Sequence, residues 1–399
     1  MNRLLFNPGP TNTRASTKRA LVVDDMSHRA PAFRAVLQQV RDALLRVLGA
    51  ESDFEALLFA CSGTGANEAA VNCLRGPVLA LVTGYYSERL ADIVERSGLE
   101  VRRMRFGTFQ GIDPREVAAE LDATPGIRSL TFVHHETATG VLTPMAALNR
   151  LAAQRGILTL VDAISSVGAH RMTLDADGPD VLTVTSNKGL EGLPGVSFVV
   201  GRRAVLENAR PGHSYYFDIA RQLEMQRGAE VPFTVPVQVI CALAEALGHF
   251  ERETPAGRAA RYALTAGVLR AGLARRGFQL VDLAPGRRSE VVVPVRLPAG
   301  LDYERARNEL DSLGIEIYTP GYAVAAGYFF MATMGPLGHA DVENGLDAFV
   351  AACERQGCPP GGALEAAGYE EDTGAAPLPG PTAGTDREEA VASVAKASA

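Results

Sequence analysis

Lysine is scarce in this chain: Lys18, Lys188 and Lys396 are the only three, and arginine supplies the remaining positive charge. No apolar run approaches the roughly 20 residues that span a bilayer, so we expect no membrane segment. The opening residues 1–10 are too short for a signal peptide. These absences predict a cytoplasmic protein with very few candidate amine nucleophiles.

Cysteine is also sparse, with five residues scattered along 399 positions and without metal-ligand spacing. This pattern predicts reduced thiols rather than a disulfide framework, and no metal site. The net charge is −7, and the segment from Gly361 onward, with seven acids and two bases, carries most of it. The remainder is close to neutral, which argues against nucleic acid or an anionic membrane as a partner.

The 47% hydrophobic content is enough for one large core and a second, smaller one. A helix is predicted over 29–49. Short apolar runs then alternate with helical patterns at 87–97 and 145–155; the runs are 56–60, 78–82, 130–133, 158–161 and 181–184. This order predicts an α/β fold whose mostly parallel sheet is covered by helices on both faces.

The pattern changes after residue 236, which predicts a smaller α+β domain. Its expected helices are 237–253, 258–276, 303–313 and 339–353, and its expected strands are 290–295, 315–318 and 327–332. We therefore expect a large domain at 1–236, a small domain at 237–358, and residues 1–25 packing on the small domain or on a partner subunit. Residues 359–399 are rich in Ala, Gly, Pro and Glu without periodicity, so a disordered tail is expected.

Lys188 follows an apolar strand in the segment VLTVTSNKGLEGLPG and is the only lysine between two apolar runs. Burial near Val184, Leu190 and Leu193 would lower its pKa, because desolvation disfavours the ammonium form. A neutral amine at this position would condense with an aldehyde. The alternative is a lysine whose amine extends to solvent.

Residues 62–70, SGTGANEAA, follow a predicted strand and open a helix, so their backbone amides would point at one anion-sized spot. A phosphate would fit there. The motif lacks a Walker lysine and the dinucleotide glycine spacing, which argues against ATP or NAD. A glycine turn with a capping Ser or Thr is the alternative.

Other polar residues also stand at the ends of predicted strands. Asp162 would suit a protonated ring nitrogen, or would simply cap a helix. Tyr85 and Tyr86 offer an aromatic face, unless they belong to the core. His134 and His135 are adjacent on a strand and so point to opposite faces, which predicts structural histidines rather than a shared metal.

Together these motifs resemble those of the class V, fold-type I pyridoxal phosphate (PLP) aminotransferases. The similarity is greatest to the branch that holds 2-aminoethylphosphonate–pyruvate and alanine–glyoxylate aminotransferases, and it runs from Asn7 to about Gly335. The motifs that carry it are SGTGANEA, VHHETATG, VDAISSVG, SNKGLEGLPG, the GHS at 212–214 and the FTVP at 233–236. The resemblance implies a homodimer with a site shared between subunits.

The resemblance also implies a role for each matching residue. Lys188 would carry PLP as a Schiff base and move the substrate proton, and Asp162 would pair with the pyridine nitrogen. Backbone at Gly9 would close over the substrate. The implied cofactor contacts are Thr64, Gly65 and Ala66 on the phosphate, Thr234 on the phosphate of the partner subunit's site, Tyr86 on the ring face, Thr137 on the ring oxygen, and Thr185 and Asn187 beside the lysine.

One position departs from the family pattern. Phe330 stands where these aminotransferases carry an arginine that grips the substrate carboxylate. Another arginine could replace it, the candidates being Arg14, Arg29, Arg221 and Arg227. The expected reaction moves an amino group between a small amine or amino acid, including an aminophosphonate such as 2-aminoethylphosphonate, and a keto acid or aldehyde. The alternatives are a PLP-dependent lyase, decarboxylase or epimerase, favoured by Phe330, and a non-catalytic protein that keeps the fold.

Overall fold

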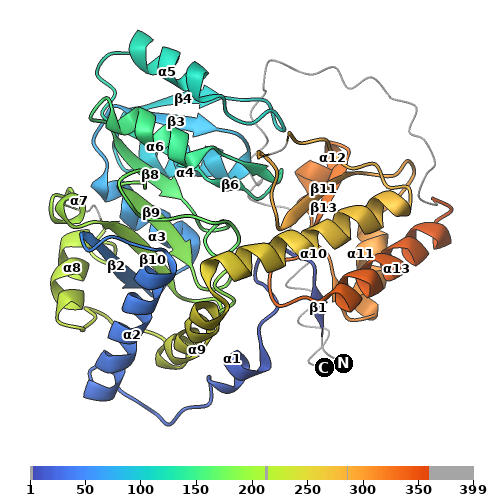
Figure 1. The fold of residues 1–399 in the computed structure, drawn as a ribbon, viewed down its shortest axis with the longest axis horizontal. Helices are drawn as coiled ribbons and strands as arrows, with labels where there is room; N and C mark the ends of the chain where they lie inside the picture. Colours follow the sequence, from blue (N-terminus) through green and yellow to red (C-terminus); the bar gives the residue numbers. More distant parts are fainter. Residues whose placement is uncertain (1–2, 212–213, 285, 359–399) are drawn as a thin grey trace, which may run out of the picture.

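The structure is a computed structural model that describes residues 3–211, 214–284 and 286–358. Gly212 and His213 of the GHS motif and the expected disordered tail lie outside these residues. Figure 1 shows a large sheet-containing lobe and a smaller lobe, with one long helix running between them. Within the described residues no helix is long and apolar enough to cross a membrane.

The large lobe is built on a seven-stranded sheet. Its strands, in spatial order, are β2 (Phe54–Phe59), β10 (Ser197–Arg202), β9 (Val181–Thr185), β8 (Leu158–Asp162), β5 (Ser129–Val133), β3 (Val78–Val82) and β4 (Val101–Arg105). Only β10 runs antiparallel to its neighbours. The mostly parallel α/β sheet expected from the sequence is confirmed, although two strands were missed. The apolar run of β10 is only three residues long, and the edge strand β4, with the sequence VRRMR, has no apolar run.

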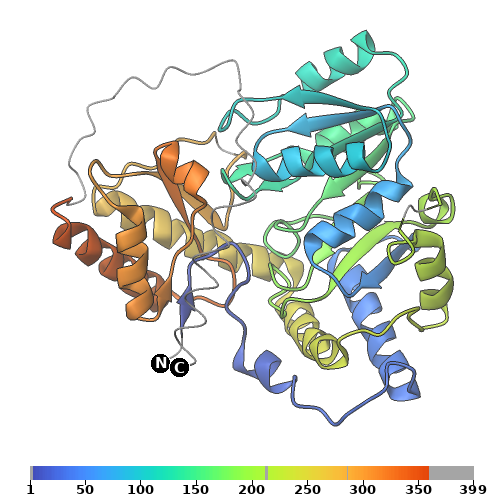
Figure 2. The same ribbon diagram turned by 180° about the vertical axis from the view of Figure 1, so that it is seen from behind.

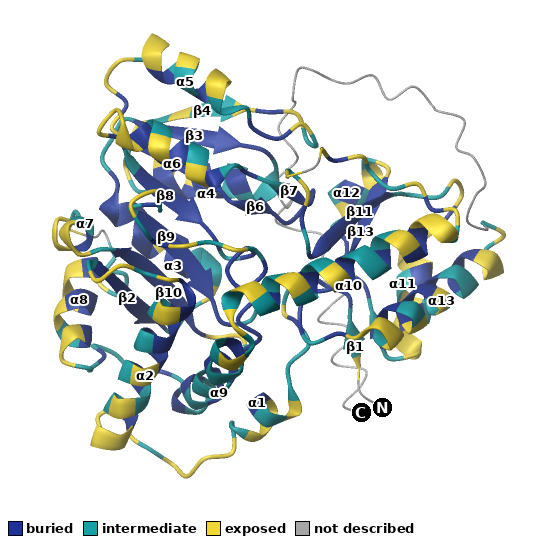
Figure 3. Cartoon of the chain, in the orientation of Figure 1, coloured by how far each residue is buried: buried dark blue, intermediate teal, exposed yellow. Residues whose placement is uncertain are grey.

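Helices cover both faces of this sheet, since successive side chains of a strand point to opposite sides. On β2, Ala56 and Leu58 join the core beneath one helical layer, while Leu57 and Phe59 join the core beneath the other. The first layer consists of α2 (Pro31–Val47), α5 (Pro114–Ala123), α6 (Met145–Ala153) and α9 (Val237–Glu253). The second layer consists of α3 (Gly63–Ala70) with the 3-10 turn Val71–Cys73, α4 (Tyr85–Arg96), α7 (Arg203–Glu207) and α8 (Ile219–Arg227). Figure 3 shows most strands of the sheet buried, the edge strand β4 partly exposed, and the outer helix faces exposed.

The smaller lobe has its own apolar core. It contains α10 (Pro255–Arg275), α11 (Tyr303–Ser312), α12 (Gly321–Ala325), α13 (His339–Arg355), and the antiparallel pair β11 (Val292–Arg296) and β13 (Tyr328–Ala332). The chain start joins it, because β1 (Leu4–Leu5) pairs with β12 (Ile315–Glu316) and Phe6 enters the core. Figure 2 shows this first segment passing from the small lobe to α1 (Ala15–Arg19).

Helix α9 packs differently from its expected place in the small domain. Its buried residues Ile240, Leu243 and Leu247 belong to the large core that also includes α2. We therefore propose that the large domain extends through Glu253 and that the small domain begins with α10. The change from sheet to helical patterning at residue 236 does not coincide with this packing boundary, since α9 is the last helix of the first layer.

Candidate active site

A cavity opens at the carboxyl edge of the large sheet, where the ends of β2, β3, β5, β8 and β9 meet. Its walls come from residues that end or follow these strands: Ser62, Gly63, Thr64, Tyr86, Arg89, Val133, His135, Thr137, Asp162, Ile164, Ser165, Thr185, Asn187 and Lys188. Parallel strands place their carboxyl ends at one edge, which is why motifs far apart in the chain converge here.

Asp162 ends β8 and is almost fully buried, at 4% exposed. Its Oδ2 accepts a hydrogen bond from Asn67 Nδ2 (2.7 Å), and its Oδ1 accepts one from the backbone N–H of Ile164 (3.0 Å). Thr183 fixes the Asn67 amide by donating to its Oδ1 (2.6 Å). Burial raises the pKa of Asp162 despite these hydrogen bonds. The carboxylate is therefore held rigidly and is best satisfied by a cation in the cavity.

Lys188 follows β9 and forms part of the same cavity wall. Burial lowers its pKa to about 8, and the attraction of Asp162 offsets part of this shift. Roughly a tenth of the amine is then neutral at pH 7, far more than for an unperturbed lysine. The sequence-based expectation of an amine made nucleophilic by desolvation matches the direction of this shift.

The amino end of α3 forms another wall, through Ser62, Gly63 and Thr64. A side chain at Gly63 would collide with Ile164, because its Cβ would lie 2.6 Å from Cδ1 of that residue. Free backbone N–H groups at a helix start attract anions. Of the three residues expected to cradle a phosphate, Thr64 lines the cavity, while Gly65 and Ala66 are buried in the next positions of the helix and do not.

Glu136 holds the start of α4, the helix that presents Tyr86. Its carboxylate accepts from the backbone N–H groups of Tyr86 (3.1 Å) and Ser87 (3.0 Å). The Arg89 guanidinium lies 4.7 Å from the centre of the Tyr86 ring. Tyr86 is thus fixed as one wall of the cavity, and neither Glu136 nor Arg89 was identified from the sequence.

The remaining predicted contacts fall in different places. Thr137 and Asn187 line the cavity; Thr137 shares a 2.6 Å hydrogen bond with Ser165, and Asn187 Oδ1 accepts from Thr185 (2.9 Å). Thr185 lines it as well. Thr234 is exposed and lies outside the walls of this chain's cavity, so its role toward a partner subunit stays a prediction.

His135 lines the cavity, and its Nδ1 donates to the Ser165 carbonyl (3.2 Å), which leaves Nε2 without a partner in the described residues. His134 is buried as well. No group of three or more His, Cys, Asp or Glu side chains suited to a metal ion occurs in the part of the chain that the structure describes.

A second cavity adjoins the first and shares Tyr86 and Lys188 with it. It lies between the lobes and is lined by Asn7, Pro8, Gly9, Pro10, Tyr86, Ala138, Lys188, Glu316, Tyr318, Pro320, Tyr322 and Phe330. Gly9 adopts a φ of +143°, and a Cβ there would lie 2.7 Å from Lys188 Cε. Only glycine lets the first segment of the chain pass this close to the lysine.

None of the four arginines considered as replacements at Phe330 lines either cavity of this chain. Arg14 lies 3.5 Å from Glu191, and Arg29 donates to the Val231 carbonyl (3.1 Å). Arg221 stacks on Tyr215, and Arg227 pairs with Glu55 and Glu207. Each guanidinium therefore has a partner elsewhere.

Glu191 connects the loop after Lys188 to the smaller lobe. It is buried, and its carboxylate pairs with Arg261 (2.5 Å) and accepts from the hydroxyl of Tyr262 (2.8 Å), both on α10. The same hydroxyl accepts from the backbone N–H of Gly335 (3.2 Å), beyond β13. A buried charge with this many partners holds the lysine loop and the small domain in one arrangement.

The chain is similar to known transaminases over most of its length. The family model "Aminotransferase class-V" matches residues 12–338. A 2-aminoethylphosphonate–pyruvate transaminase of Syntrophobacter fumaroxidans is 31% identical over 363 residues, covering 89% of this chain and 97% of that protein. Two solved structures share the fold. An alanine–glyoxylate aminotransferase from Nostoc is 28% identical, with a TM-score of 0.80, and the match covers 89% of this chain and 95% of that one. An aspartate aminotransferase from Thermus thermophilus is 29% identical, with a TM-score of 0.79, and the match covers 88% of this chain and 99% of that one.

The fold is that of the fold-type I PLP-dependent transferases, as the sequence predicted. The chain belongs to the class-V aminotransferase family and is an aminotransferase. The family implies PLP as cofactor. The first cavity fits PLP, because it combines the Lys188 amine, the buried Asp162 carboxylate, the Tyr86 ring and the amino end of α3, where a phosphate could bind.

Proposed function

We propose that this protein transfers the amino group of a small primary amine or amino acid to a keto acid or aldehyde, with PLP held in the first cavity. The observation that carries this proposal is the position of Lys188, which stands in the shared wall of two cavities. One cavity suits the cofactor and the other opens between the lobes to admit a substrate. An aminophosphonate donor is one candidate, since the relative from Syntrophobacter is named for 2-aminoethylphosphonate.

The chain's own groups divide the work between them. PLP, when bound, supplies an electron sink. Asp162 would keep the ring nitrogen protonated, Tyr86 would hold the ring face, and the start of α3 would bind the phosphate. The Lys188 amine, neutral in part near pH 7, would take a proton from the substrate carbon and return it. The site is proposed to be shared across a homodimer, with Thr234 reaching the partner subunit's phosphate.

A half-reaction tests the proposal. Incubation of the PLP-loaded protein with an amine donor alone should convert the visible absorbance of the aldehyde form into that of the aminated form, in proportion to the protein present. A keto acid added afterwards should restore the original spectrum. A lyase, decarboxylase or epimerase would release product from the donor without this lasting conversion, and that result would overturn transamination.

The capture of PLP by cofactor-free protein should depend on pH with a midpoint near 8, because only the neutral form of Lys188 attacks an aldehyde. Its pKa is lowered by burial to about 8, so the neutral fraction falls about tenfold for each pH unit below that value. Stopped-flow absorbance gives the rate, and borohydride trapping with peptide mass spectrometry gives the position. A capture rate that is still rising steeply between pH 9 and 10 would contradict the lowered pKa.

A further inference from the structure

The second cavity has an unusual charge pattern for a site expected to take an anionic donor. Lys188 and Glu316 are the only charged side chains among its described lining residues. The lysine amine is committed to the cofactor under the proposed function, which leaves Glu316 as the one charge that the described lining residues of this chain offer a substrate in the second cavity. A carboxylate or phosphonate on the donor would face this acid with no guanidinium to pair with.

The hydrogen bond between Asn7 and Glu316 adds a second acceptor. Asn7 Nδ2 donates to Glu316 Oε1 (2.7 Å), and because a carboxylate only accepts, the amide orientation is fixed. Asn7 Oδ1 is then left buried without a partner in the described residues, and the side chain is 5% exposed. A buried acceptor of this kind needs a donor from a ligand.

Aromatic rings supply the other walls. Tyr86, Tyr318, Tyr322 and Phe330 line the cavity. The Tyr322 hydroxyl also lacks a partner within the described residues. Aromatic faces attract cations, and a site that combines them with a carboxylate is typical of ammonium recognition.

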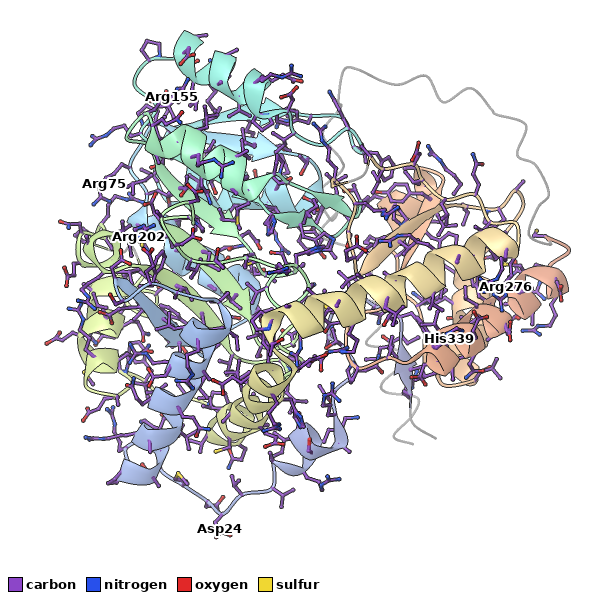
Figure 4. All side chains as sticks on the ribbon, viewed as in Figure 1. Asp24, Arg75, Arg155, Arg202, Arg276 and His339 are labelled. Carbon is purple, nitrogen blue, oxygen red and sulfur yellow. The ribbon has the colours of Figure 1, made fainter. Side chains whose placement is uncertain are left out.

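Arg89 lines the adjoining first cavity, with its guanidinium 4.7 Å from the centre of the Tyr86 ring, but it does not line the second cavity. Other arginines are engaged at the protein surface. Figure 4 shows Arg155, Arg202 and Arg276 at the outer surface of the two lobes. They pair there with acids, as in Arg155 with Asp122 (2.9 Å) and Arg276 with Glu343 (2.8 Å). Phe330 occupies the position at which the family pattern has its carboxylate-binding arginine, and it is 3% exposed.

We propose that the second cavity selects an amine donor whose far end carries a second amine or ammonium group, held by Glu316 and Asn7, rather than a carboxylate or phosphonate. This inference rests on the proposed function, and it narrows the substrate to the class of diamines and amino-substituted amines. Glu316 is the specificity-determining residue in this assignment.

Donors of matched length test the charge preference. The PLP-loaded protein is given 1,3-diaminopropane, 3-aminopropan-1-ol, 3-aminopropanoate or 2-aminoethylphosphonate, and kcat/KM of the half-reaction is measured for each. We expect the diamine to exceed both anionic donors by roughly tenfold to a hundredfold, the effect of one charged hydrogen bond. The neutral amino alcohol should fall between them.

Glu316→Gln separates charge from shape, because the glutamine carbonyl still accepts from Asn7. The diamine should lose roughly tenfold in kcat/KM, mostly through KM, while the amino alcohol changes by less than about threefold. Glu304→Gln is the matched control, since that acid pairs with Arg307 on the surface of α11 and lines neither cavity. Its donor profile should equal that of the parent protein.

The outcomes distinguish this inference from the proposed function. Faster conversion with an anionic donor than with the diamine overturns the inference and leaves transamination standing. The same holds if Glu316→Gln lowers kcat/KM equally for all donors. If no amine donor converts the cofactor, the proposed function fails and the inference fails with it. Phe330→Arg, where it folds, should shift the preference toward the anionic donors.

Discussion

Replacement of Lys188 by alanine is expected to abolish transamination, with a fall in kcat of at least 10²–10⁴-fold, the range contributed by one positioned proton-transfer group. The structure gives the reason: Lys188 is the only lysine among the described residues that line either cavity, and burial lowers its pKa to about 8. The variant should also lose the visible absorbance of lysine-bound cofactor. Steady-state assays and a spectrum after dialysis measure the two effects.

Lys18→Ala is the control for this experiment, because Lys18 is exposed on α1 and lines neither cavity. That variant should keep both the spectrum and the rate. An unchanged visible spectrum in Lys188→Ala after exhaustive dialysis would mean that another group binds the cofactor, and the proposed site would then be wrong.

Asp162→Asn is expected to lower kcat by roughly 10²–10³-fold, the range seen on removal of one preorganised electrostatic partner. Asparagine keeps the size of the side chain and, with its oxygen toward Asn67, that hydrogen bond, but it loses the hydrogen bond from the Ile164 backbone N–H. It also cannot hold a proton on a ring nitrogen by charge. The protein should therefore still bind PLP and give an altered absorption spectrum. Rate measurements at saturating cofactor separate this loss from weaker binding.

Asp180→Asn is the matched control, since Asp180 lies at the opposite end of the sheet and accepts from the backbone N–H of Thr159 (2.8 Å). It should affect folding stability without a selective loss of kcat. Near-normal turnover in Asp162→Asn with cofactor bound would show that this carboxylate does not control the ring nitrogen.

Much of the first cavity follows from the sequence because its residues stand directly after strands. Asp162, Tyr86 and Lys188 were predicted to converge, since apolar runs of four or five residues mark buried strands and parallel strands end at one edge. The fold was predictable for the same reason. The antiparallel β10 was not, because its run Phe198–Val200 is too short to distinguish from a loop.

The contacts that orient these groups were not predictable. Asn67 lies inside the SGTGANEA motif, yet its hydrogen bond to Asp162 depends on how α3 packs on the sheet. Asn7 and Glu316 are 309 positions apart and meet only because β1 pairs with β12. Neither pair leaves a local signal in hydrophobic periodicity. Phe330 was noticed only as a departure from a family pattern.

Glu191 links the loop after Lys188 to α10 of the smaller lobe. Under the proposed function the large sheet carries the chemistry, while the walls that select the substrate come largely from the small lobe and the start of the chain. Because Arg261 and Tyr262 both bind Glu191, a tilt of α10 would displace the loop that carries Lys188. Under the proposed function, substrate binding in the second cavity and the position of the Lys188 amine would therefore be coupled, and we expect a poorly fitting substrate to lower kcat as well as binding affinity.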